Sequence, residues 1–210
     1  PGYFTNVIPT EPYAALSDEN TKLTFYYDKM KADRNGMSVG PFNAYFDIPW
    51  SDVRLSITTV KFDNSFANYT GLTSTKWMLG DLAYLESIEG IENLKTDNVT
   101  DMSNMFNGCG ITSLDLSSLN TTNVTNMSSM FEMCLNLKTL DVSNFNTANV
   151  TDMSHMFYRC EKLENLNITN FVTSSVTDMS DMFHDCKTLT SLDLSSFNTE
   201  KVTQMGEFFW

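Results

Sequence analysis

The chain has 210 residues, of which 41% are hydrophobic and 12% aromatic, so it is long enough for one ordinary domain with a sizeable core. Its net charge of -13 argues against binding to nucleic acid or to an anionic membrane surface, because those partners need clustered Lys and Arg. No apolar run approaches ~18 residues, so direct membrane insertion is not expected. The sequence opens at PGYF without Met, which suggests processing or an artificial boundary. The lack of an export leader therefore does not argue against an exported protein.

Residues 1–65 do not follow the repeat that fills the rest of the chain, and they are predicted to form an N-terminal β-rich capping segment. Strand-forming residues at 13–16 and 22–27 flank the turn sequence Ser-Asp-Glu-Asn, a pattern typical of a β-hairpin. A third strand is predicted at 56–62, which is rich in Thr, Ile and Val. A stack of repeats needs a cap over its first coil, and this segment is the candidate.

Residues 66–210 are predicted to form a repeat array. The stretch VTDMSNMFNGC at 99–109 returns as VTNMSSMFEMC, VTDMSHMFYRC and VTDMSDMFHDC at intervals of 25 or 26 residues. A fixed period of this size indicates a solenoid, in which stacked coils share one continuous core. The predicted divisions are a degenerate first coil at 66–98, regular coils at 99–123, 124–149, 150–175 and 176–201, and a partial coil at 202–210.

Two hydrophobic periods alternate within each unit. In the third regular coil, apolar residues recur at i, i+3, i+4 and i+7, which predicts a two-turn helix: Met153, Met156, Phe157 and Cys160. The alternation that follows at 163–168 predicts a short strand. The expected fold is therefore an α/β repeat, a right-handed solenoid like those of leucine-rich-repeat (LRR) proteins, with one short strand and one short helix per coil of 25–26 residues.

The pattern VTDMSxMFxxCxxLxxLDLSxFNT resembles the repeats of BspA-like bacterial leucine-rich-repeat surface proteins, and the resemblance covers about 11–210. It implies an exported bacterial protein, on the cell surface or secreted, whose array binds host or neighbouring-cell proteins as an adhesin does. It gives no catalytic residues to carry over, and we expect no cofactor. One departure is Leu119, where the other regular units carry Phe145, Phe171 and Phe197.

Each regular unit carries one cysteine at the same position: Cys109, Cys134, Cys160 and Cys186. Stacking could bring neighbouring cysteines within disulfide distance, but the expected state is a buried column of free thiols, with no zinc site among them. Acidic columns also recur, one at Asp101, Asn126, Asp152 and Asp178, the other at Asp115, Asp141, Asn167 and Asp193. Helix capping accounts for the first column, and calcium binding is the alternative.

No motif of an enzyme is present, and the two histidines, His155 and His184, fall at different positions in the coil. We expect a non-enzymatic protein-binding module that acts as a monomer on an extracellular protein. The predicted binding residues lie on the outward side of the third regular coil, where residue types common in interfaces gather: His155, Tyr158, Arg159 and Lys162. The alternative function is a stiff structural spacer or stalk that presents another domain at the cell surface.

Overall fold

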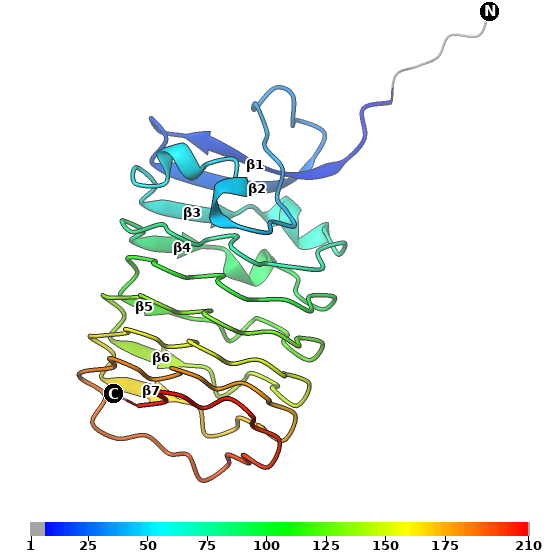
Figure 1. Cartoon of the computed structure of the whole chain (residues 1–210). Coiled ribbons are helices and arrows are strands. Elements are labelled where there is room, and N and C mark those ends of the chain that lie inside the picture. The colour runs from blue at the N-terminus through cyan, green and yellow to red at the C-terminus, as the bar shows by residue number, and fades with distance from the viewer. Residues whose placement is uncertain (1–6, 210) are drawn as a thin grey trace, which may run out of the picture.

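The computed structural model describes residues 7–209, and within them it consists of strands, turns and short 3₁₀ helices, without an α-helix. Figure 1 shows the chain winding downward in successive flat coils, from a strand-rich end near the N-terminus to the last coil near the C-terminus. The short helices are η1 (Tyr45–Asp47), η2 (Ser51–Val53), η3 (Asn64–Asn68) and η4 (Ile91–Asn93).

A four-stranded sheet forms the N-terminal end, in the order β1 (Glu11–Ser17), β2 (Lys22–Asp28), β3 (Thr59–Phe62) and β4 (Ser87–Glu89). β1 and β2 pair antiparallel, which confirms the predicted hairpin, and β3 confirms the predicted third strand in a shorter form. β2, β3 and β4 pair in parallel. The sheet therefore joins the predicted capping segment to the predicted degenerate coil, since β4 lies in 66–98.

The core of this end is a cluster of aromatic side chains that differ from one another in type and orientation. Phe25 stacks on Phe62 with ring centroids 4.8 Å apart and meets Trp50 edge-on at 5.7 Å. Phe66 packs edge-on against Phe25 at 5.8 Å. All four are buried, so this end is held by contacts between different elements that occur once each.

Two parallel ladders join the successive coils. The first is the sheet of β5 (Ser113–Leu114), β6 (Thr139–Asp141) and β7 (Asn165–Asn167), in which Leu140 pairs with Leu166 one period later. The second is a series of single bridges that runs through Ser74, Asp101, Asn126, Asp152, Asp178 and Gln204. The predicted strands of the first three regular coils are thus confirmed, whereas the fourth has bridged residues but no strand at 189–194.

The predicted helix in each coil is wrong. Residues 154–159 form consecutive turns, because His155 and Arg159 adopt left-handed backbone angles, with φ of 57° and 56°. The amides that a helix would bond within itself instead reach the next coil: His155 N–H donates to the Ser180 carbonyl at 2.8 Å, and Arg159 N–H to that of His184 at 2.8 Å. Every regular coil has left-handed residues at these two positions, so none of them forms a helix.

The apolar residues of the expected helix nevertheless form the core, in columns that run through the stack. The rings of Phe106, Phe131, Phe157 and Phe183 lie nearly parallel, with centroids 5.5, 5.6 and 5.6 Å apart. The methionines that recur at matching positions in successive coils are also fully buried, which confirms that they are packing residues.

A column of buried threonines also lies inside the stack: Thr96, Thr121, Thr147 and Thr173. The Thr121 hydroxyl donates to the Asn146 carbonyl at 3.1 Å and accepts from the Asn146 N–H at 2.7 Å. Each buried hydroxyl is thereby satisfied by the next coil, and the column ties the coils together away from the strands.

Candidate functional site

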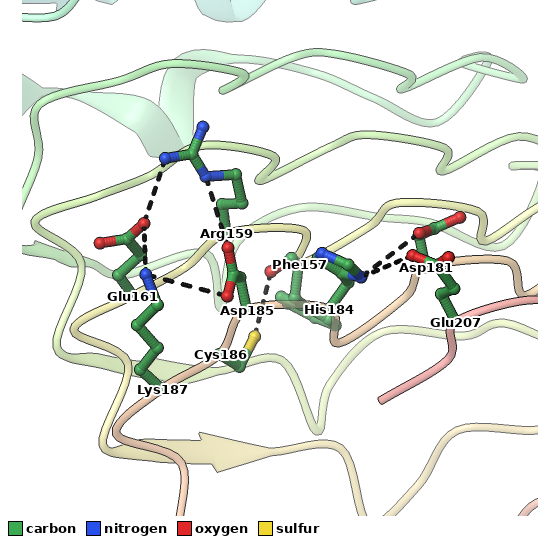
Figure 2. A network of polar contacts seen from close by, with 9 residues as sticks. All are labelled: Phe157, Arg159, Glu161, Asp181, His184, Asp185, Cys186, Lys187 and Glu207. Carbon is green, nitrogen blue, oxygen red and sulfur yellow. Dashed lines mark hydrogen bonds and ion pairs between the residues drawn. The ribbon is translucent and has the colours of Figure 1, made fainter. Parts of the chain in front are cut away.

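The predicted binding residues do not all lie together. His155, Tyr158 and Arg159 belong to the turns at 154–159 and face residues of the next coil, as Figure 2 shows for Arg159 and Asp185. Lys162 lies apart, because its ammonium donates to the Asn136 side-chain oxygen on the preceding coil at 2.9 Å. The structure thus assembles three of the four predicted residues, and it adds partners from one period further along the chain.

We call the assembled group the turn cluster. Its members come from three successive coils and share one surface: His155, Tyr158, Arg159, Glu161, Asp181, His184, Asp185, Lys187 and Glu207. Six of them were missed from the sequence, although the signal was present. A shift of 26 residues carries Tyr158 to His184, Arg159 to Asp185 and Glu161 to Lys187. Since stacked coils place such residues side by side, the period itself identifies the neighbours.

The middle of the turn cluster is aromatic. The Tyr158 ring stacks on the His184 imidazole, with centroids 4.9 Å apart and planes 21° from parallel. The Tyr158 ring also contacts the His155 ring, with centroids 5.5 Å apart. The His184 side chain is only 9% exposed, so the stack holds its imidazole in one orientation beneath the surface.

One end of the turn cluster is a closed set of four charges. Arg159 lies 3.2 Å from the Glu161 carboxylate and 3.8 Å from that of Asp185, and Lys187 lies 3.1 and 3.8 Å from the same two groups (Figure 2). Hydrogen bonds from Lys187 and then from Arg159 lower the pKa of the Glu161 carboxyl. The Arg159 charge is therefore partly balanced within the chain, through exposed ion pairs that each contribute little.

The other end gathers imidazole and carboxylate groups. His184 Nδ1 lies 3.3 Å from Glu207 Oε2 and 3.6 Å from Asp181 Oδ1 (Figure 2). The second oxygen of Asp181 lies 3.6 Å from His155 Nε2. His155, Asp181 and Glu207 occupy one coil position in three successive coils, and all three have left-handed backbone angles. Both histidines of the chain, which looked unrelated in the sequence, thus face the same carboxylate.

The four cysteines form the predicted column of free thiols, with Cys109, Cys134 and Cys160 buried and Cys186 half-buried. Each thiol donates to a main-chain carbonyl of the preceding coil, as Cys134 does to Phe106 at 3.1 Å. Burial raises the pKa of Cys134 and of Cys186 to about 12. These thiols stay protonated near neutral pH and are packing residues.

The acidic columns do not cap helices, which corrects that interpretation. Asp152 Oδ1 accepts hydrogen bonds from the N–H and the hydroxyl of Ser154, at 2.9 and 2.7 Å, and so forms a local turn. Asp141 does the same with the N–H of Ser143 at 2.9 Å. Hydrogen bonds from Ser143 lower the pKa of Asp141. One oxygen of each carboxylate is therefore used locally, and the calcium alternative for these columns stays a prediction.

A second candidate surface lies over the ladder of β5, β6 and β7. It is a shallow hollow of about 480 Å³, with half-buried leucines at its base and polar side chains around it: Leu114, Leu166, Thr139, Asp141, Glu164 and Asn165. Its acidic rim agrees with the charge of the chain. The hollow offers a face for a partner, although with fewer aromatic side chains than the turn cluster.

Comparison with known proteins gives one family match. The model of the family described as "Mycoplasma protein of unknown function, DUF285" matches residues 73–189 and 136–210. This match fits the resemblance to BspA-like repeat proteins. No curated protein matches. A leucine-rich repeat protein from Eubacterium ventriosum ATCC 27560 aligns over 96% of this chain and 93% of its own, at 14% identity and a TM-score of 0.28, which is too low to support a conclusion about fold or function.

Proposed function

The chain belongs to the DUF285 family, and from that premise we propose that it is a non-enzymatic, adhesin-like protein-binding module, secreted by a bacterium or held on its surface. The proposal treats the stacked coils as the right-handed LRR-like solenoid that the sequence predicts, and its partner as an extracellular protein of the host or of a neighbouring cell. No helix in residues 7–209 is both long and apolar enough to cross a membrane.

The turn cluster is the observation that carries this proposal. At the same coil positions the first two regular coils have small or flexible residues, whereas the third and fourth have Tyr158, Arg159 and His184. The buried methionine and phenylalanine columns beneath these turns are the same in all four coils. Outward positions that vary while the core is kept constant are typical of repeat proteins that bind other proteins. Tyr, moreover, is among the residue types that contribute most to binding energy at interfaces.

The test is binding of the purified protein to an array of extracellular-matrix and mucosal proteins at physiological salt. The informative variant is Tyr158→Ala with Arg159→Ala, and its matched control is Glu132→Ala with Met133→Ala, the equivalent pair one coil earlier. A saturable interaction lost in the first variant and kept in the control supports the proposal. Binding kept in both would move the interface to another surface, such as the hollow over β5–β7.

The second candidate function is the stiff structural spacer, and the closed set of charges favours it. Arg159 and Lys187 are both neutralised by Glu161 and Asp185, so these side chains brace the third coil against the fourth. A spacer needs such bracing and needs no ligand. If no protein on the array binds, and the Tyr158→Ala, Arg159→Ala variant melts at a lower temperature than wild type, the cluster is a brace and the spacer function is favoured.

A further inference from the structure

The imidazole and carboxylate groups of the turn cluster form an arrangement that neither the protein-binding proposal nor packing requires. The ligand atoms of Asp181, His184 and Glu207 all lie within 4.8 Å of one another. Two carboxylates held this close repel each other, and the chain already carries a net charge of -13. A positive charge between them would remove this repulsion.

We propose that Asp181, His184 and Glu207 bind one divalent transition-metal ion of the zinc class, through Asp181 Oδ1, His184 Nδ1 and Glu207 Oε2. The proposal is independent of the protein-binding function. One nitrogen and two oxygen donors suit zinc and its neighbours, whereas calcium and magnesium prefer sites made only of oxygen. Three protein ligands leave a fourth position for water.

Two of the three distances between donor atoms are close to those expected for this ion. Metal–ligand bonds of about 2.0–2.1 Å in a tetrahedral site place neighbouring donor atoms about 3.3–3.4 Å apart. His184 Nδ1 lies 3.3 Å from Glu207 Oε2 and 3.6 Å from Asp181 Oδ1. The Glu207 side chain is 68% exposed and has room to adjust around an ion.

Two further features prepare the site. His184 is held by its stack on Tyr158, with the ring nearly buried and its Nδ1 edge turned towards the carboxylates (Figure 2). His155 Nε2 lies 3.6 Å from the Asp181 oxygen that does not face His184. Carboxylates that bind metals are commonly oriented by such outer partners. We therefore assign His155 the role of a positioning residue for Asp181.

The experiment is titration of the full 210-residue protein, freed of metal with a chelator, with zinc chloride in an isothermal calorimeter near neutral pH. We expect one ion per chain. Glu207→Gln should weaken binding by about tenfold or more, whereas Glu200→Gln, at an exposed position in the fourth regular coil, should leave it unchanged. Because Glu207 is exposed, its substitution removes a ligand without disturbing the core. His155→Gln should weaken binding by less than Glu207→Gln.

Two additional measurements identify the ligands and the ion. Cobalt bound at this site should give a visible spectrum without a thiolate charge-transfer band, and zinc should raise the melting temperature of the wild type but not of Glu207→Gln. The proposal is overturned by a thiolate band, which would place the ion on a cysteine, or by equal zinc affinity in Glu207→Gln. It is also overturned by calcium binding as tightly as zinc, or by an absence of saturable zinc binding.

Discussion

The two ends of this molecule are stabilised in different ways. Near the N-terminus, Phe25, Trp50, Phe62 and Phe66 meet at different angles and from different elements, so each contact occurs once. In the repeat region, a side chain stacks on its own copy one coil away, as in the parallel phenylalanine rings. Unique packing ties distant parts of the chain together, whereas columns tie each coil only to its neighbours.

The largest expected effects come from removing one aromatic side chain at each end. Trp50→Ala and Phe157→Ala each delete a buried ring, and each should lower the free energy of unfolding by about 3–5 kcal/mol. Hydrogen exchange in the native protein should separate them. Phe157→Ala should speed exchange mainly in the coils next to residue 157, and Trp50→Ala mainly in β1–β3. Equally faster hydrogen exchange throughout both variants would show that the two ends unfold as one unit, which would contradict the proposed difference between them.

Gly110 lies where the first interval of the repeat is one residue shorter. A Cβ atom at Gly110 would lie 2.1 Å from the Ala83 carbonyl oxygen, which belongs to the backbone and cannot turn aside. Gly110→Ala should therefore reduce stability by about 1–3 kcal/mol, as measured by the urea midpoint. Gly206→Ala is the control, because nothing lies within 4 Å of its added Cβ, and its midpoint should stay near that of wild type. Equal midpoints for the two variants would contradict the tight contact.

Gly108 isolates the cost of the left-handed turn. It has φ of 69°, and the nearest atom to an added Cβ is 3.5 Å away, so space is not limiting. Gly108→Ala should lower stability by about 1 kcal/mol through backbone strain alone. Met133 occupies the equivalent position with φ of 56°. Met133→Gly should change stability by less than about 1 kcal/mol, because relief of strain offsets the flexibility of glycine in the unfolded chain. A neutral Gly108→Ala would mean that the turn is not left-handed in solution.

The N-terminal end should also respond to pH through Tyr13, Asp28 and Arg34. Burial opposes ionisation of Asp28, but hydrogen bonds from Tyr13 and Arg34 lower its pKa overall. Burial and the hydrogen bond to Asp28 raise the pKa of Tyr13 to about 12. The contribution of Asp28 to the free energy of unfolding is present above the pKa of the unfolded chain, about 3.9. It is lost as the pH falls below that value. The Tyr13 contribution is complete below about pH 10 and is lost as pH rises from 10 towards 12.

Tyr13→Phe provides the test of this pH dependence. The difference in melting temperature between wild type and Tyr13→Phe should be constant from about pH 6 to 9 and should shrink as the pH approaches 12. Subtracting the variant removes the contribution of the other tyrosines. A difference that stays constant up to pH 12 would show that the Tyr13 hydroxyl has no stabilising partner.

The smallest expected effect concerns the cysteine column and changes reactivity rather than stability. In the folded protein at pH 8, iodoacetamide should modify Cys186 first, because it is half-buried, whereas Cys109, Cys134 and Cys160 should resist. Mass spectrometry after denaturation without reductant should find four modifiable thiols. Fewer than four would indicate a disulfide, and rapid modification of Cys134 in the native state would show that the column opens.

The sequence predicted the parts of the fold that depend on period and missed those that depend on backbone angle. Met153, Met156, Phe157 and Cys160 are buried as expected, but two consecutive turns bury the same positions as a helix does. A left-handed backbone is uncommon for Arg159, although His155 and several of the aligned residues belong to types that adopt it more readily: Asn104, Gly108, Asp181 and Asp185. That conformation follows from the inter-coil hydrogen bonds, which become visible only when the next coil is in place.

The candidate site was predicted in part for a related reason. Tyr158 and Arg159 were chosen by residue type, and residue type does not show that Glu161 and Asp185 neutralise Arg159. The period of 26 places Asp181 beside His155 and Glu207 beyond it, so this column could have been found from spacing alone. The approach of His184 to the same carboxylates could not have been found from spacing, because it depends on how the turn orients the imidazole ring.

In the threonine column, each hydroxyl bonds to the following coil, at an offset of 24 residues for Thr96 and of 25 residues for Thr121, Thr147 and Thr173. An inserted copy of one whole unit would therefore find the same donors and acceptors on both of its sides. At the level of the gene, near-identical coding segments are substrates for unequal recombination, which adds or deletes complete units. Such events would change the length of the protein in steps of one coil while leaving every remaining interface intact. Selection could therefore change the length of the array without changing its core.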